Sequence, residues 1–195
     1  MGEYEYKTIK ENSYILEIKK SKFIAQGFSV KKDSECKKII NKIQKKYHDA
    51  KHNVYAFVLS DGTSRNSDDK EPPGTAGIQV LNAINNYNLK NILIIVTRYF
   101  GGILLGTGGL SRAYYSSADL LIKNSEIIEE FVPEIINLEF DYKTYNKILG
   151  SKLFNINISK IDFSEKVKIE FKIKKNKVQE FKSKLENLLS TSILF

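Results

Sequence analysis

Residues 91–97, Asn-Ile-Leu-Ile-Ile-Val-Thr, constrain the fold more than any other segment of the chain. A strand with one solvated face alternates apolar and polar residues, whereas this run is apolar on both faces. It therefore predicts a central strand of a sheet that is covered on both sides. Five of the eleven glycines follow between positions 101 and 109, and a helix is predicted from about Leu110 to Lys123.

The residues before this strand predict further strands and helices of the same domain. Hydrophobic periodicity places its elements in this order: strand Ser13–Ile18, strand Phe23–Val30, a helix capped by Asp33 or Ser34, strand Asn53–Leu59 and helix Thr75–Tyr87. Residues 60–73 are polar and turn-rich and predict a loop. Cys36 lies on the apolar face of the first helix, so we assign it no chemistry.

A change of character near Pro133 predicts two domains, 1–132 and 133–195, in a protein of the α+β class. The second domain is expected to contain strands at 135–142, 155–161, 167–173 and 192–195, with helices at 144–154 and 177–189. This βαββαβ order predicts a ferredoxin-like domain. Nothing in it resembles a catalytic site.

Composition excludes several classes of protein. No stretch reaches the ~18 apolar residues of a membrane span, and the N-terminus lacks the basic-then-apolar order of a signal peptide. A single cysteine excludes an internal disulfide. We therefore expect a cytoplasmic protein without a membrane partner. The formal charge of +8 favours polyanionic partners, and each predicted domain carries an excess of four basic residues.

Only three of the 31 basic residues are arginines, and all three lie between positions 60 and 118. They are Arg65, Arg98 and Arg112. A guanidinium has a planar fork of donors that lysine lacks, so a lysine-rich chain that keeps arginine here indicates geometric hydrogen bonding. Two interpretations stay open: these side chains bind an anion, or they brace loops.

The glycine-rich segment joins a strand to a helix, and such a segment presents backbone N–H groups and the positive end of the helix dipole to an anion. The candidate anion- or RNA-binding residues are Arg65, Arg98, Gly101, Gly102, Gly106, Thr107, Gly108, Gly109, Ser111 and Arg112. The segment is not a Walker A loop, and it only nearly matches the dinucleotide fingerprint. Alternatively, these glycines permit positive φ and close backbone contact.

An acidic loop precedes this segment in the chain. We expect its members to organise loops, partly by holding the arginines; the residues are His52, Asp68, Asp69, Glu71 and Thr75. Metal binding by the three acids is a weaker alternative. His48 and His52 lack a third ligand, and no nucleophile has a paired base. We therefore predict no metal, no cofactor and no catalytic residue, and an enzyme is unsupported.

Four groups of residues together resemble one protein family. They are Ser21–Ala25, Ala50–Asn53, Ser67–Gly77 and Val96–Gly102 with Gly108–Tyr114. Their order and spacing resemble the YigZ/IMPACT family over roughly residues 15–120. The resemblance implies that the first domain is an α/β sandwich like the second domain of a small-subunit ribosomal protein. It also implies that the C-terminal domain is similar to the last domain of elongation factor G. Eukaryotic members regulate translation by competing for an activator of a kinase.

The chain departs from the family pattern at four positions: Lys70 replaces glycine, Pro73 serine, Gln79 proline and Leu104 lysine. The change at 104 removes a cation from the expected anion site, and Lys70 compensates if the two loops meet. Our leading hypothesis is a translation-associated regulator that binds RNA or the ribosome. The alternatives are a small-molecule phosphate or nucleotide binder, conceivably an enzyme, and a protein-interaction module. The sequence does not indicate an oligomeric state.

Overall fold

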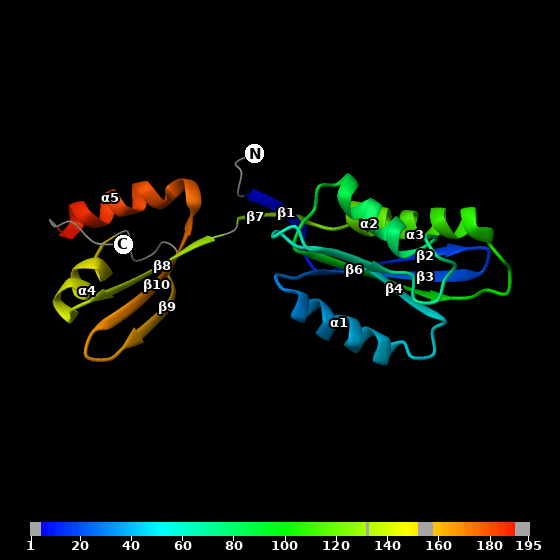
Figure 1. Ribbon diagram of the computed structural model, residues 1–195, viewed down its shortest axis with the longest axis horizontal. Coiled ribbons are helices and arrows are strands. Elements are labelled where there is room, and N and C mark those ends of the chain that lie inside the picture. Colours follow the sequence, from blue (N-terminus) through cyan, green and yellow to red (C-terminus); the bar gives the residue numbers. More distant parts are fainter. Residues whose placement is uncertain (1–4, 132, 152–157, 190–195) are drawn as a thin grey trace. The chain divides into compact units, whose positions relative to one another are not determined.

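The structure, a computed structural model, describes residues 5–131, 133–151 and 158–189. The chain divides into two compact units (Figure 1). One is formed by Tyr6–Glu130, and the other contains Glu5 and the described residues from Phe131 onward. The larger sheet of each unit is antiparallel, which confirms the α+β class. Within the described ranges, no helix is long and apolar enough to cross a membrane.

A five-stranded sheet forms the centre of the first unit. Its strands, in spatial order, are β2 (Asn12–Ile18), β3 (Ser21–Ser29), β6 (Ile92–Tyr99), β4 (His52–Val58) and β5 (Ser64–Ser67). The apolar run at 91–97 thus supplies the middle strand, as predicted. Alternate side chains of β6 enter different cores: Ile94 belongs to one cluster and Leu93 to the other.

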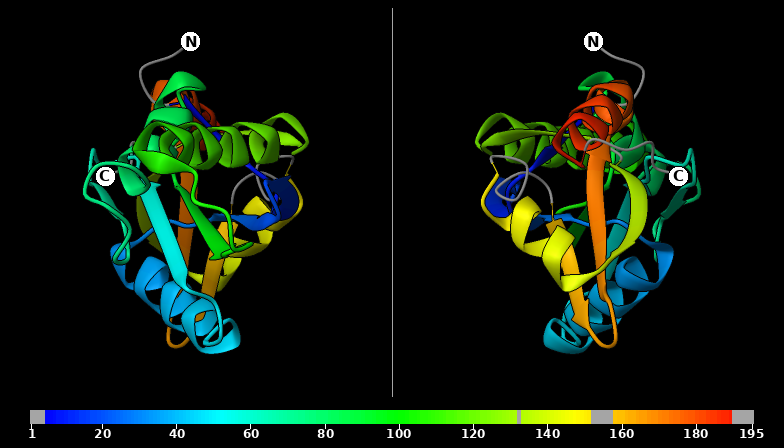
Figure 2. Two further views of the ribbon diagram at one scale, coloured as in Figure 1. Left: turned by 90° about the vertical axis from the view of Figure 1, so that its right-hand side faces the viewer. Right: turned by 90° about the vertical axis from the view of Figure 1, so that its left-hand side faces the viewer.

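Helices cover both faces of this sheet, as the apolar character of β6 requires (Figure 2). Helices α2 (Gly77–Asn86) and α3 (Gly106–Lys123) cover the face that carries Ile94. Helix α1 (Asp33–Lys46) covers the opposite face, where Cys36 is buried. Burial raises the pKa of the Cys36 thiol to about 11. The interpretation of Cys36 as a core residue is therefore confirmed.

Two of the predicted helix starts were wrong. Helix α3 begins at Gly106 rather than near Leu110, because the glycines expected in a loop take up its first turn. Asp33 is the first residue of α1 and does not cap it. The Asp33 carboxylate pairs instead with Lys37 one turn later. Hydrophobic periodicity does not distinguish this ion pair from a helix cap.

Three strands were not predicted. Strand β5 lies within residues 60–73, where a loop was predicted. It forms there because its backbone N–H and C=O groups pair with those of β4. Strands β1 (Glu5–Ile9) and β7 (Ile127–Phe131) form a separate two-stranded sheet. All three strands are short, and their pairing depends on segments elsewhere in the chain.

The second unit contains a three-stranded sheet in the order β8–β10–β9. Its elements are β8 (Pro133–Phe140), α4 (Tyr142–Leu149), β9 (Ile158–Phe163), β10 (Val167–Lys174), a short 3₁₀ turn (Lys175–Lys177) and α5 (Val178–Leu189). The core joins one face of the sheet to both helices. The predicted strand at 192–195, and the helix end and strand start expected at 152–157, lie outside the described residues.

Candidate functional site

Strand parity directs Arg98 into the interior. Ile94 and Val96 face the core beneath α2 and α3, so Arg98 continues the same row at the end of β6. The register places His52 of β4 and Phe23 of β3 opposite it on either side. The Arg98 side chain is only 6% exposed and lies over the Phe23 ring, with its guanidinium carbon 5.5 Å from the ring centroid.

A buried carboxylate compensates the charge of Arg98. Glu71 Oε1 accepts hydrogen bonds from Arg98 Nη1 at 2.6 Å and from the Tyr114 hydroxyl at 2.8 Å. His52 Nε2 lies 3.6 Å from the same oxygen. Burial, followed by the Glu71 charge, raises the pKa of Tyr114 well above its usual value, so its hydroxyl remains a donor. These groups form a polar cluster inside an otherwise apolar core.

The loop before α2 carries Glu71 to this position. The Asp68 carboxylate accepts hydrogen bonds from the backbone N–H groups of Gly74, Ala76 and Gly77, which fixes the turn that leads into the helix. Asp69 accepts a hydrogen bond from the Asn53 N–H at 2.6 Å.

Two further contacts hold the same loop. The carbonyl of Asp69 lies 2.7 Å from His52 Nδ1, which requires the proton to be on that nitrogen. Thr75 Oγ1 donates to the Pro72 carbonyl at 2.7 Å. The expected loop-organising residues therefore converge on one loop, and Glu71 holds Arg98.

A pocket of about 390 Å³ opens above the cluster. We call it the Arg98 pocket. Its walls are Lys51, His52, Lys70, Glu71, Pro72, Arg98, Phe100, Leu104, Leu105, Gly106, Thr107 and Leu110. The acidic loop and the glycine-rich segment, which are about 30 residues apart in the chain, therefore meet at one site.

The first turn of α3 forms one wall of this pocket and has no side-chain cap. Its residue before the helix is Leu105, and no acidic residue lies in the first turn. The first N–H groups of a helix have no intrahelical acceptor, and the helix dipole favours an anion there. This wall is therefore an unfilled donor surface.

Arg98 adds unused donors at the same place. A guanidinium has five N–H donors. Among the described residues, the Arg98 side chain makes one hydrogen bond, from Nη1 to Glu71, while its Nε is enclosed without a partner. Lys51 and Lys70 are exposed at the rim. The pocket thus combines three cations and a helix N-terminus with a single carboxylate.

The glycines serve different purposes. A Cβ at Gly101 would lie 2.0 Å from the backbone carbon of Lys20, so this glycine allows close contact with the β2–β3 turn. Gly108, in contrast, is exposed, and a Cβ there would meet only the Arg112 side chain at 3.5 Å. Packing explains Gly101 but does not explain Gly108.

Several of the predicted residues do not line the pocket. Arg65 lies on β5, and its Nη1 is 3.4 Å from Asp33 Oδ1. Arg112 is exposed on α3, with its guanidinium beside the helix start at Gly108. Gly101, Gly102, Gly108, Gly109 and Ser111 are near the pocket in the chain but are not among its lining residues.

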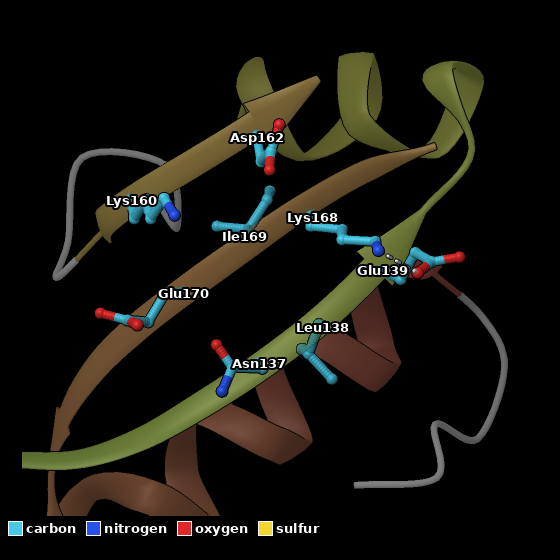
Figure 3. A pocket seen from close by; sticks show the side chains of 8 residues that line it. All are labelled: Asn137, Leu138, Glu139, Lys160, Asp162, Lys168, Ile169 and Glu170. Atoms are coloured by element: carbon cyan, nitrogen blue, oxygen red, sulfur yellow. Dashed lines mark ion pairs between the residues drawn. The ribbon is translucent and has the colours of Figure 1, made fainter. Parts of the chain in front are cut away.

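A second hollow lies on the open face of the C-terminal sheet (Figure 3). Its charged side chains rise from the three strands and oppose one another across them. Lys168 is in register with Glu139 and Asp162, and Glu170 with Lys160. Two lysines thus face three carboxylates, an arrangement typical of cross-strand pairing. This hollow offers no surplus charge to a polyanion.

The described residues contain no group of three or more His, Cys, Asp or Glu side chains placed to hold a metal ion. His48 and His52 do not act together, because His48 contacts the Lys45 carbonyl while His52 joins the Glu71 cluster.

Comparison with known proteins identifies the family. The Impact N-terminal domain model matches residues 19–122, and IMPACT family member YvyE of Bacillus subtilis is 34% identical over 91% of this chain and 84% of its own length. The chain belongs to the IMPACT family. The resemblance inferred from the sequence motifs is therefore confirmed for this IMPACT family protein.

Two solved structures were compared with the IMPACT family chain. The crystal structure of a hypothetical protein aligns with a TM-score of 0.74 and 26% identity, covering 98% of both chains. The two-domain translational regulator Yih1 aligns with a TM-score of 0.36 over 63% of this chain and 48% of its own, which is too low to carry an argument.

Sequence reasoning missed Lys51, Phe100 and Leu105 of the pocket, and it missed Tyr114 of the polar cluster. One available signal was strand parity. Counting every second residue from Ile94 places Arg98 on the buried face, and this count favours bracing over free surface binding.

Proposed function

We propose that this IMPACT family protein is a translation-associated regulator that binds RNA or the ribosome by holding an RNA phosphate in the Arg98 pocket. The translational role follows from the family resemblance. The site follows from one observation: an uncapped helix N-terminus and a buried arginine with unused donors line the same pocket. Both features attract a phosphate group.

The position of Arg98 allows it both to bind an anion and to brace a loop, the two roles considered from the sequence. Its Nη1 braces the acidic loop through Glu71. Its Nη2, which is neither hydrogen-bonded to a described residue nor enclosed, is available to a ligand. Because this loop fixes the guanidinium in place, little side-chain entropy is lost on binding. Asp68, Asp69 and Thr75 act on phosphate binding indirectly, as positioning residues.

The rim extends the positive charge toward solvent. Lys70 and Leu104 line the same pocket from different loops. The family pattern has lysine at position 104, so Lys70 supplies a cation from the other loop. Arg112 lies outside the pocket beside the start of α3 and can contact a neighbouring phosphate of the same strand. Together these groups suit a polyanion that continues beyond the pocket.

The domain assignments complete the proposal. We assign residues 1–132 to a domain like the second domain of a small-subunit ribosomal protein, and residues 133–195 to a ferredoxin-like domain similar to the last domain of elongation factor G. The strand order β8–β10–β9 supports the second assignment. Both resemblances are to components of translation, and they favour RNA as the ligand.

The test is a gain-of-charge experiment. Fluorescence anisotropy would measure binding of the full chain to a labelled single-stranded RNA, and co-sedimentation would measure binding to ribosomes. Leu104→Lys places a cation on the pocket wall and should tighten RNA binding by about threefold to fivefold at low salt.

Ile103→Lys is the matched control. Ile103 is also exposed and adjacent in the chain, but it does not line the pocket. The two variants have the same net charge, so a general electrostatic effect would strengthen both equally. Equal strengthening, or no binding of RNA and ribosomes by any of the proteins, contradicts the proposal.

A small-molecule phosphate ligand is the second candidate, and pocket geometry favours it. The volume of about 390 Å³ falls within the range of small-molecule sites, and the floor is buried. A thermal-shift screen with nucleotides and sugar phosphates tests this candidate, because a ligand at 100 times its Kd stabilises the fold by about 2.7 kcal/mol. No shift with any of them excludes it.

A further inference from the structure

A carboxylate stands in the middle of a pocket that otherwise attracts anions. The Glu71 side chain is 3% exposed and lines the pocket together with Arg98. If the pocket served only to hold a phosphate, a negative charge at its floor would weaken that binding. The ion pair with Arg98 accounts for the position of one carboxylate oxygen of Glu71. The other oxygen requires a separate explanation.

The two oxygens of Glu71 have different surroundings. Oε1 receives the hydrogen bonds of Arg98 and Tyr114 and lies closest to His52. Oε2 accepts no hydrogen bond from any residue that the structure describes, and it is not among the enclosed atoms that lack a partner. The pocket floor therefore presents a fixed, negatively charged acceptor beside the unused donors of Arg98.

This pairing identifies the chemistry of the ligand. A phosphate diester has acceptors but no donor, so it satisfies Arg98 and the start of α3 and leaves Oε2 unmatched. A hydroxyl group close to the phosphate supplies the missing donor. The Rossmann dinucleotide site, for example, holds a pyrophosphate at a helix N-terminus and uses a carboxylate to bind a ribose hydroxyl. In RNA, the 2′-hydroxyl lies next to the phosphate and is absent from DNA.

We propose that the Arg98 pocket binds a ribonucleotide unit, with the phosphate at Arg98 and the first turn of α3, and a ribose hydroxyl donating to Glu71 Oε2. This inference rests on the proposed phosphate binding and names the feature by which the site selects its ligand. The pocket prefers RNA over DNA of the same sequence and charge.

The experiment compares three labelled oligonucleotides of one sequence with ribose, 2′-deoxyribose or 2′-fluororibose sugars, bound to the full chain. The 2′-fluoro sugar keeps the pucker of ribose but cannot donate. A hydrogen bond to a charged group is expected to make the ribose form bind about tenfold tighter than either of the others.

Each outcome has a distinct meaning. Equal binding of all three oligonucleotides overturns the inference but leaves phosphate binding intact. Binding of the 2′-fluoro form as tight as that of the ribose form also overturns it, because the site then recognises the shape of the sugar and not its hydroxyl. If none of the three binds, phosphate binding of RNA fails instead. Competition with free uridine monophosphate shows whether the pocket binds the ribonucleotide unit only within RNA or also as a mononucleotide. Displacement of RNA by uridine monophosphate supports the proposed binding of a phosphate and a ribose hydroxyl.

A Glu71→Gln variant provides a second readout. The amide oxygen can still accept from Arg98, and its NH₂ group then faces the pocket as a donor. The loss of negative charge should tighten binding of the deoxy oligonucleotide. The ribose and deoxyribose forms should then bind with about equal affinity. A folded variant that keeps the full preference overturns the inference. Should the variant fail to fold, the three-sugar comparison in the unaltered protein decides.

Discussion

At the residue scale, conformation and charge conflict at Lys70. This residue has φ of +67°, in the left-handed region, where a side chain is disfavoured. The family pattern has glycine here, and the neighbouring Asp69 also has positive φ. The lysine charge lies on the pocket wall. The chain therefore keeps backbone strain at the position where a cation would contact the ligand.

Lys70→Gly should stabilise the protein and weaken its binding. Relief of the left-handed conformation is expected to raise the free energy of unfolding by about 1 kcal/mol, measured by denaturant titration. Loss of the cation should weaken RNA binding. Lys20→Gly is the control, since Lys20 has φ of +64° in the β2–β3 turn but does not line the pocket. It should gain stability and keep its affinity; a loss of affinity there would argue against Lys70 as a contact.

A pair of glycine substitutions tests which of these glycines is required for packing. Gly101→Ala pushes a methyl group into the backbone at Lys20 and should lower the free energy of unfolding by about 1–3 kcal/mol. Gly108→Ala meets no backbone and should raise it by up to about 1 kcal/mol, because alanine favours the helix. Thermal denaturation of both variants is the measurement. Equal destabilisation would show that the two glycines serve the same packing role.

At the element scale, the small sheet of β1 and β7 depends on side-chain contacts as well as backbone pairing. The Tyr6 hydroxyl donates to Glu130 Oε2 at 2.7 Å, and Lys31 Nζ lies 3.1 Å from the same oxygen. The Tyr6 hydrogen bond, more than the nearby lysine, lowers the pKa of Glu130 below its usual value of 4.5. The sheet therefore acquires a dependence on pH.

The sign follows from linkage. A carboxylate whose pKa is lowered in the folded state stabilises the fold above its unfolded pKa, and that contribution disappears as pH falls through the folded pKa. Stability should accordingly fall below about pH 4.5. Glu130→Gln should lose less stability over this interval, and Tyr6→Phe should behave in the same way. Urea titrations across the pH range test this, and three parallel profiles would contradict it.

Helix α3 shows how one element serves two functions. Its later turns bury Ala113, Tyr114 and Ala118 against the sheet, whereas its first turn is glycine-rich and uncapped at the pocket. Most stability of a helix in a protein comes from such packing, so the packed turns can tolerate a weak start. The exposed donors at Gly106 and Thr107 are a consequence of this division.

At the scale of the whole molecule, charge is dispersed. Residues 1–132 hold 19 basic and 15 acidic residues, and residues 133–195 hold 12 and 8. The open face of the C-terminal sheet pairs its charges internally. Specific contact is thus expected at the Arg98 pocket, while the net charge of +8 attracts polyanions without selecting among them.

Binding to single-stranded RNA should weaken linearly on a log–log plot against salt. If Arg98, Lys51 and Lys70 each contact a different phosphate of the strand, the slope is about −2, since each phosphate contributes about −0.7. Lys70→Ala should reduce the magnitude of this slope by about 0.7. Anisotropy titrations over a salt series give the slope. A flat dependence would exclude phosphate contact as the source of affinity.

The sequence by itself determined the elements whose signals are local. The apolar run at 91–97 predicted the central strand, and the spacing of Cys36 with Ile40 and Ile43 predicted the buried face of α1. The motif set identified the family, and the candidate residues included Arg98, Glu71, Gly106 and Thr107, which line the pocket. Periodicity and spacing suffice for these features because each depends on neighbours within a few turns or a single strand.

Only the tertiary structure decided which candidates meet. Strand register places His52 beside Arg98, the loop held by Asp68 brings Glu71 to both, and α3 directs its first turn toward them. Arg65 has the same chemistry but lies on an edge strand away from the pocket. The difference between the two Glu71 oxygens also arises here. These contacts join segments far apart in the chain, so they depend on sheet register and loop closure, which local sequence patterns do not encode.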